Sequence, residues 1–194
     1  MPFPRLRTLI VLALLLFAVA GSVLYVIYAR PVHARLRPPP ELARLEWETP
    51  PHPVPAVGFA GAGGERVTPA SFAGHYVLLN LWATWCAPCV RELPQLGQLH
   101  AALPALDVVP VNVGRGGTAE TTAFLRTHGA ASLAVYIDTD AALIRAFNVP
   151  GLPVSVLIDP KGREIARALG PCNWGAPAAI AYFRSLMARR APNS

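Results

Sequence analysis

The feature that most constrains the fold is a pair of cysteines placed between a buried strand and a helix. The run Tyr76–Leu81 is apolar at almost every position, as in a central strand covered on both faces. Cys86-Ala-Pro-Cys89 follows at once, and helical spacing then continues to about Ala102. Pro88 suits the first turn of a helix, where a missing N–H costs nothing. This order predicts a dithiol at the start of a helix, beside a central strand.

The pattern after the dithiol alternates strands and helices. Further strands are predicted at residues 108–113, 154–158 and 164–169, the last two joined by a turn at 159–162. Further helices are predicted at residues 140–147, 176–189 and 118–128, the last with Thr118 as N-cap and Gly129 as its stop. Strands that alternate with helices and end in a hairpin predict the α/β class, with a mixed central sheet and helices on both faces.

The N-terminal region predicts a membrane anchor. Leu9–Tyr28 holds twenty uncharged residues, which at about 1.5 Å per residue span a hydrocarbon core of roughly 30 Å. The alternative is a cleaved signal peptide, since Ala18-Val-Ala20 fits a small-x-small cleavage site. The apolar run continues past Ala20, which favours the uncleaved anchor. Arginines at 30, 35 and 37 outnumber those at 5 and 7, so the positive-inside rule alone does not favour an exported domain.

The sequence divides the chain into five expected parts. The expected parts are a tail at 1–8, the anchor at 9–28, a linker at 29–56, a domain at 57–190 and a C-terminal tail at 191–194. The linker is assigned because residues 31–56 contain eight prolines, which remove backbone donors and favour an extended, semi-rigid chain. Trp47 within it can lie at the membrane interface or pack on the domain.

Composition and charge exclude two classes of protein. The chain is 53% hydrophobic and 14% charged, which argues against disorder for most of it. The net charge is +6, but half of the excess lies within residues 1–56. The rest is scattered, and no Lys/Arg cluster interleaved with aromatic residues is present, so nucleic acid is not an expected partner.

The dithiol predicts redox chemistry with no further cofactor. At the helix N-terminus, unpaired N–H groups and the helix dipole favour a negative sulfur, which is expected to lower the pKa of the Cys86 thiol and make it the nucleophile. Cys89, one turn further in, can attack the mixed disulfide and release the product. The alternative is half of a zinc site. Zinc requires a second pair of ligands, and the histidines are scattered at 33, 52, 75, 100 and 128, so no metal is expected.

These residues resemble the active site of a known family. Leu78–Pro94 contains Trp-Cys-Ala-Pro-Cys, and Val149–Gly162 contains a Gly-Leu-Pro loop before a strand. Both resemble the TlpA/ResA/CcmG group of membrane-anchored bacterial thiol–disulfide oxidoreductases, TlpA above all. The resemblance covers roughly residues 57–190. It implies a thioredoxin fold behind one N-terminal transmembrane helix, a single-pass protein of the bacterial inner membrane, and a catalytic domain in the periplasm; with a cleaved signal the domain is soluble there.

The resemblance also implies roles for residues around the dithiol. Pro153 corresponds to a cis proline that faces the dithiol, and Leu152 to its neighbour that contacts the substrate backbone. Trp85, Leu152 and Pro153 are the expected substrate-binding residues. From the residues alone, Trp85 can simply cover the dithiol, and Trp82 is expected in the core. Pro94 corresponds to a proline that kinks the active-site helix; an ordinary helix break is the alternative.

Proton transfer is assigned to Glu92. It lies three residues after Cys89, so its carboxylate can approach the dithiol from one turn along the helix. The matching acid of the family tunes thiol pKa values and moves protons; a solvated helix glutamate is the alternative. Cytoplasmic thioredoxins carry a buried acid in the preceding strand, where this chain has Asn80, which cannot ionise.

Cys172 is a possible third redox thiol. If the strand that begins near Pro153 leaves the dithiol edge, its hairpin partner returns to that edge by Gly170, which places Cys172 near the dithiol. An inert buried thiol is the alternative. As a hypothesis, Cys172 forms an alternative disulfide or a metal contact.

Three functions are considered. The leading one is a reductase of exported cysteine proteins, such as apocytochrome c or copper-site proteins, supplied by a membrane dithiol donor; its direction follows from the resemblance. The second is a thiol peroxidase. That family needs Thr or Ser three residues before the reactive cysteine and Pro seven before, where this chain has Ala83 and Leu79, so this function is not expected. The remaining alternative is a copper(I) chaperone that binds the metal with the same two thiolates.

Overall fold

The computed structural model describes residues 14–16, 18–21 and 37–190, and the chain divides into two units, Met1–Arg37 and Pro38–Ser194. In the first unit, residues 14–16 and 18–21 are helical. The rest of the predicted anchor at 9–28 lies outside the described residues, as do the tails at 1–8 and 191–194. Among the described residues, no helix has the length and apolar character needed to cross a membrane.

A mixed sheet forms the centre of the second unit. Within residues 37–190, eight strands follow the order β1-β8-β7-β4-β5-β6-β2-β3. Their bounds are β1 Leu45–Pro53, β2 Phe59–Ala60, β3 Arg66–Val67, β4 Tyr76–Trp82, β5 Leu106–Asn112, β6 Tyr136–Ile137, β7 Val154–Ile158 and β8 Arg163–Leu169. Every residue of β4 is buried, because β4 lies in the middle of the sheet and both of its faces are covered.

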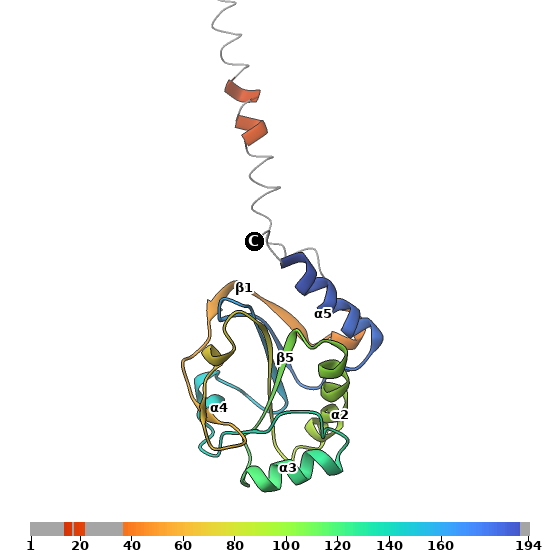
Figure 1. The fold of residues 1–194 in the computed structure, drawn as a ribbon. Coiled ribbons are helices and arrows are strands. Elements are labelled where there is room, and N and C mark those ends of the chain that lie inside the picture. Colours follow the sequence, from red (N-terminus) through yellow and green to blue (C-terminus); the bar gives the residue numbers. More distant parts are fainter. Residues whose placement is uncertain (1–13, 17, 22–36, 191–194) are drawn as a thin grey trace, which may run out of the picture. The chain divides into compact units, whose positions relative to one another are not determined.

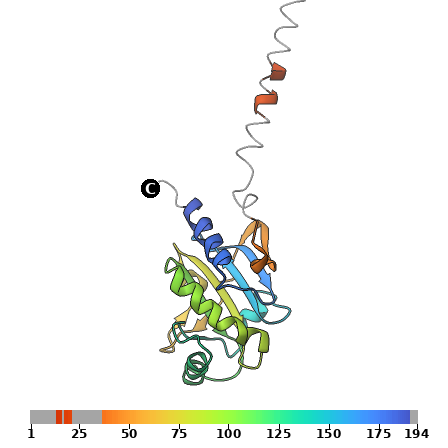
Figure 2. The same ribbon diagram turned by 90° about the vertical axis from the view of Figure 1, so that its right-hand side faces the viewer.

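Helices cover both faces of this sheet, as predicted. The helical elements are η2 Pro40–Leu42, η3 Pro69–Phe72, α2 Ala87–Ala102, α3 Thr118–Thr127, α4 Ala142–Ala146 and α5 Pro177–Arg190. Figures 1 and 2 show α2 and α5 on one face and α4 on the other. The α4 face contains an apolar core in which Leu143 and Phe147 meet alternate residues of the central strands, including Leu79, Val111 and Val156.

The predicted elements are present, with shifts of at most two residues at their ends. The helix predicted at 118–128 begins after Gly117 as N-cap, so the prediction of Thr118 as N-cap was wrong. The Gly117 N–H donates to Glu120 Oε2 at 3.0 Å, which satisfies this end of the helix without a hydroxyl group from residue 118. Gly129, with φ of 71°, follows the C-cap and stops the helix as predicted.

The predicted linker at 29–56 was too long at its C-terminal end. Residues 45–53 form β1, which pairs antiparallel with β8 at an edge of the sheet. Proline is tolerated there because one side of an edge strand has no ladder partner, and the register is interrupted between Trp47 and His52. Trp47 packs on the domain, where it lies against Tyr182 of α5. The domain therefore begins before residue 57.

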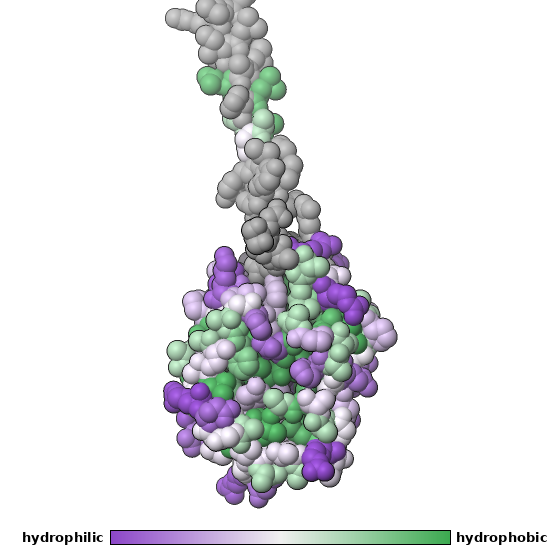
Figure 3. Space-filling view, in the orientation of Figure 1, coloured by the Kyte–Doolittle hydropathy of each residue, from purple (hydrophilic) through white to green (hydrophobic). Residues whose placement is uncertain are grey.

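Hydrophilic residues are dispersed on the face of the domain shown in Figure 3. They form several separate groups with apolar residues between them. This distribution agrees with the scattered charge of the sequence.

The short helix α4 depends on a side-chain cap. Asp138 is buried and accepts hydrogen bonds from the N–H groups of Ala142 at 3.1 Å and Leu143 at 2.7 Å. We expect Asp138→Ala to lower the free energy of unfolding by about 1–2 kcal/mol, because two helix N–H groups lose their acceptor. Urea unfolding measures the change. Asp140→Ala, at an exposed position in the same turn, is the matched control, and an equal loss in both variants contradicts the assignment.

Candidate active site

Four segments meet at one end of the central strands, the dithiol edge of the sheet. β4 and β5 are parallel, so both end at this edge, and β7 is antiparallel to β4 and begins there. Val154 pairs with both Leu81 and Leu169, so β8 ends at the same edge. The segments at 83–86, 113–117, 149–153 and 170–175 therefore lie together, in agreement with the predicted position of the dithiol.

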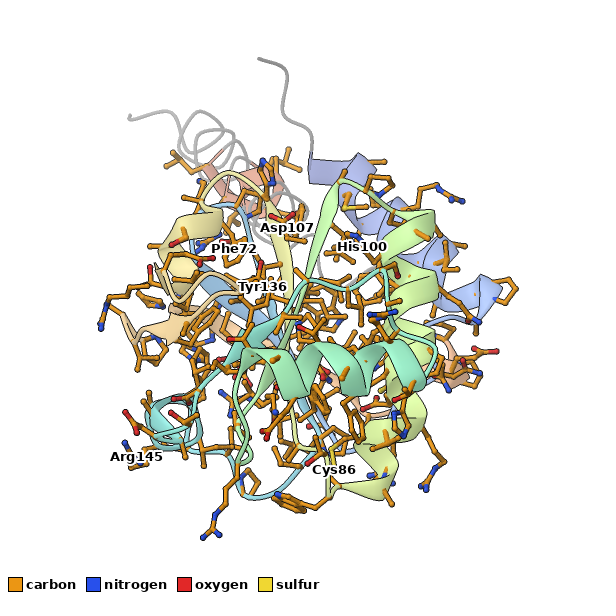
Figure 4. The ribbon with its side chains drawn as sticks, turned by 60° about the horizontal axis from the view of Figure 1, so that its bottom comes forward. Phe72, Cys86, His100, Asp107, Tyr136 and Arg145 are labelled. Atoms are coloured by element: carbon orange, nitrogen blue, oxygen red, sulfur yellow. A yellow bond between two sulfur atoms is a disulfide. The ribbon has the colours of Figure 1, made fainter. Side chains whose placement is uncertain are left out.

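The dithiol occupies the N-terminus of α2. Cys86 is the N-cap, and its Sγ accepts a hydrogen bond from the Cys89 N–H at 3.4 Å. The two sulfurs form a disulfide. Cys86 is 5% exposed and Cys89 1%, so Cys86 is the more accessible of the two. Figure 4 shows Cys86 at one end of α2 and His100 near the other. An N–H group that points at Cys86 Sγ stabilises a thiolate there once the disulfide is reduced.

Trp85 is the largest exposed apolar side chain at this edge, with 73% of its surface accessible. Its indole lies close to Gly114, in the segment that follows β5. A Cβ at position 114 would lie 3.1 Å from Ala83 Cβ and 3.1 Å from Asn112 Oδ1. Glycine therefore permits the close approach of this segment to the turn before the dithiol.

The loop before β7 adjoins the dithiol turn. The Leu152–Pro153 peptide bond is cis, as the family resemblance implied. Pro153 is buried, whereas Leu152 is half-buried and packs against the α4-face core. The Pro153 carbonyl accepts a hydrogen bond from the Gly170 N–H at 2.9 Å, which ties this loop to the segment after β8.

Glu92 is buried, which excludes the solvated helix glutamate. It is 2% exposed, and its Oε1 accepts two hydrogen bonds, from Trp174 Nε1 at 2.6 Å and from the Cys172 N–H at 2.7 Å. Oε2 is buried and has no hydrogen-bond partner among the described residues. Burial raises the pKa of Glu92 to about 7, although the two hydrogen bonds oppose this change. The carboxyl group can therefore gain or lose a proton near neutral pH.

Four further predicted residues support the site. Asn80 is buried and donates through Nδ2 to Ser155 Oγ at 2.9 Å, so its amide is satisfied within the sheet. Trp82 is fully buried, as predicted, and its ring lies 5.7 Å from that of Phe124. The remaining two are prolines within α2, Pro88 in its first turn and Pro94 in its interior. Pro94 is inside a continuous helix, so it is not an ordinary helix break.

Cys172 lies at the dithiol edge, as the hairpin argument predicted. It is buried, and its backbone N–H binds Glu92. Burial and the neighbouring Glu92 carboxylate raise the pKa of the Cys172 thiol to about 11, so it is protonated at neutral pH. Among the described residues, no group of three or more His, Cys, Asp or Glu side chains is placed to hold a metal. These observations favour the inert thiol over the third redox thiol.

Alkylation tests this view of Cys172. In the oxidised protein, Cys86 and Cys89 are blocked by their disulfide, so iodoacetamide reports on Cys172 alone. Because only the thiolate reacts, a pKa of about 11 instead of 9.0 predicts labelling roughly 100-fold slower than that of an ordinary thiol at pH 8. Mass spectrometry follows the reaction, and unfolding in denaturant should restore the ordinary rate. Rapid labelling of the folded protein contradicts the prediction.

Sequence reasoning missed Trp174. It is fully buried in the segment between β8 and α5, and it is the side chain that binds Glu92. The two residues are 82 positions apart, and neither spacing nor a local motif connects them.

Known proteins resemble this chain in both sequence and structure. Residues 50–167 match the AhpC/TSA family. The thiol-disulfide oxidoreductase ResA of Bacillus subtilis (strain 168) is 33% identical over 109 residues, which cover 55% of this chain and 60% of that protein. ResA of Geobacillus kaustophilus (strain HTA426) is 33% identical over 95 residues, which cover 48% of this chain and 53% of that protein.

A solved structure has the same fold over most of its length. It is described as a thiol:disulfide interchange protein, DsbE, of Chlorobium tepidum. It matches with a TM-score of 0.59 and 28% identity, and the match covers 71% of this chain and 95% of that one. The fold is therefore thioredoxin-like, as predicted. The chain spans little more than half the length of the ResA proteins it matches, and it belongs to the AhpC/TSA family as a homologue of the ResA thiol-disulfide oxidoreductases.

Proposed function

We propose that this protein is a thiol–disulfide oxidoreductase that reduces disulfides of exported cysteine proteins. The observation that carries the proposal is the Cys86–Cys89 disulfide at the N-terminus of α2, with the N–H of Cys89 directed at Cys86 Sγ. The named activity of the ResA homologues supports it.

The reaction has two exchange steps. The Cys86 thiolate attacks one sulfur of the client disulfide, which forms a mixed disulfide and releases one client thiolate. The Cys89 thiol then passes its proton to Glu92 and attacks Cys86 Sγ. This step forms the Cys86–Cys89 disulfide and releases the second client thiolate. The client gains two electrons and the protein dithiol loses two, so a membrane dithiol donor must reduce the protein again.

The surface around the dithiol suits an extended client segment. The exposed face of Trp85 provides apolar contact, and the Leu152–Pro153 loop lies at the same edge of the sheet. We assign these three residues to client binding. Apocytochrome c and copper-site proteins are the proposed clients, through the family resemblance.

We also propose that the domain works outside the cytoplasm. Residues 9–28 are long and apolar enough for a bilayer anchor, and the homologous relationship to ResA agrees with export. The proposed location is the periplasmic side of a bacterial inner membrane, with signal cleavage as the alternative. Carbonate extraction of membranes, followed by N-terminal sequencing of the mature protein, separates the two.

Trapping tests the function. A Cys89→Ala variant cannot resolve the mixed disulfide, so clients should remain linked to Cys86 and be released by dithiothreitol. Mass spectrometry identifies them, and a Cys86→Ala, Cys89→Ala variant is the control for non-specific capture. Stoichiometric copper(I) binding without any disulfide exchange by the purified protein would support the chaperone alternative instead.

A further inference from the structure

The segment between β8 and α5 connects two parts of the site. Gly170 has φ of 97° and turns the chain back, and its N–H binds the Pro153 carbonyl at 2.9 Å. Two and four residues later, the Cys172 N–H and the Trp174 indole N–H both reach Glu92 Oε1. The same segment is fixed from its other side, because the Asn173 N–H donates to the Glu41 carbonyl at 2.9 Å.

The two donors make the carboxyl oxygens of Glu92 unequal. Both N–H groups point at Oε1, at 2.6 and 2.7 Å, and a protonated Oε1 would place its own hydrogen against two other donors. Oε2 is buried and has no hydrogen-bond partner in the described part of the chain. When Glu92 is neutral, its proton therefore resides on Oε2.

We propose that Trp174, together with the Cys172 backbone amide, is a positioning residue that fixes Glu92 so that Oε2 alone exchanges protons with the dithiol. The proposal rests on the proton-transfer role assigned to Glu92 above. Trp174 is suited to this task because its ring is fully buried and packs on Phe183 of α5, with ring centroids 6.1 Å apart. Its N–H is therefore held in one orientation.

The surroundings of Glu92 are otherwise mainly uncharged. Cys172 faces it from the segment after β8 as a neutral thiol, and Cys89 lies one turn before it on α2. Arg44, which precedes β1, contacts Cys172. Hydrogen bonds to a carboxylate stabilise its charged form, so loss of the Trp174 donor should raise the pKa of Glu92.

Trp174→Phe tests the proposal. It keeps an aromatic ring and removes the N–H. We expect the pH midpoint of thiol–disulfide exchange to move upward by about one pH unit, as for the loss of one hydrogen bond to a charged group. Infrared titration of the Glu92 carboxyl band, identified by its loss in Glu92→Gln, should show the same shift. Trp47→Phe is the matched control, because Trp47 lies against Tyr182 and should leave both midpoints unchanged.

A second variant and a second measurement distinguish a misfolded variant, a wrong role for Trp174 and a wrong proposed function. If Trp174→Phe does not fold, incorporation of benzothienylalanine at position 174 replaces only the N–H by sulfur, and the same upward shift is expected. A folded variant whose Glu92 midpoint matches the wild type overturns the positioning role of Trp174. If the wild-type protein shows no exchange at all, the proposed function fails, while the infrared titration still tests the positioning role by itself.

Discussion

Cys86→Ser is expected to abolish disulfide exchange, with a loss on the order of 10³-fold or more in the rate of client reduction. The physical reason is that no second nucleophile can take its place. Cys89 is 1% exposed, and the pKa of Cys172 is about 11, so neither presents an accessible thiolate at neutral pH. Reduction of a fluorescent disulfide peptide by the pre-reduced protein measures the rate.

The companion variants make this prediction specific. Cys89→Ala should retain the first attack and accumulate the mixed disulfide, so it should give one stoichiometric release of client thiol without turnover. Cys172→Ala removes the other thiol of the domain and tests whether that thiol supplies any residual rate in Cys86→Ser. Turnover by Cys86→Ser at a rate near the wild type would mean that the nucleophile has been wrongly assigned.

Glu92→Gln is expected to produce the second large effect, a fall on the order of 10²-fold in the exchange rate at neutral pH. Only the ionised carboxylate can accept the Cys89 proton, so the wild-type rate should rise with pH through about 7, where Glu92 loses its own proton. The variant has no group to ionise at this position, so this inflection should disappear. A pH profile that is unchanged in Glu92→Gln contradicts the proton-transfer role.

The same variant should alter the pH dependence of stability. Burial raises the pKa of Glu92 from 4.5 to about 7, so the folded state binds a proton more tightly than the unfolded state. The stabilisation from this protonation is fully present below pH 4.5 and is lost as the pH rises through about 7. The difference in pKa corresponds to about 3 kcal/mol.

Urea unfolding between pH 4 and pH 8 measures this change. The slope attributable to Glu92 should vanish in Glu92→Gln, because the amide resembles the protonated acid at every pH. Glu46→Gln, at an exposed position of β1, is the matched control and should retain the wild-type slope. A slope that persists in Glu92→Gln shows that other groups are responsible.

Local sequence determined the central part of the fold and the position of the dithiol. The mostly apolar run at 76–82 is typical of a covered strand, and the Cys-Ala-Pro-Cys turn after it carries its own helix start, so these elements follow from neighbouring residues. The turn at 159–162 likewise predicted the hairpin of β7 and β8. The cis geometry of Pro153 was predicted by resemblance, because the local preference for trans gives no signal for it.

Tertiary structure alone decided that residues 45–53 form the edge strand β1 and that Glu92 is buried. The prolines of residues 45–53 indicate a linker until β8 is present to pair with them, because an edge strand gains its hydrogen bonds from a distant partner. Glu92 has the same local spacing in a solvated helix and in a buried one. Burial in the folded domain raises its pKa. The hydrogen bonds from Trp174 and Cys172, which the fold brings to Oε1 from about 80 residues away, oppose that rise.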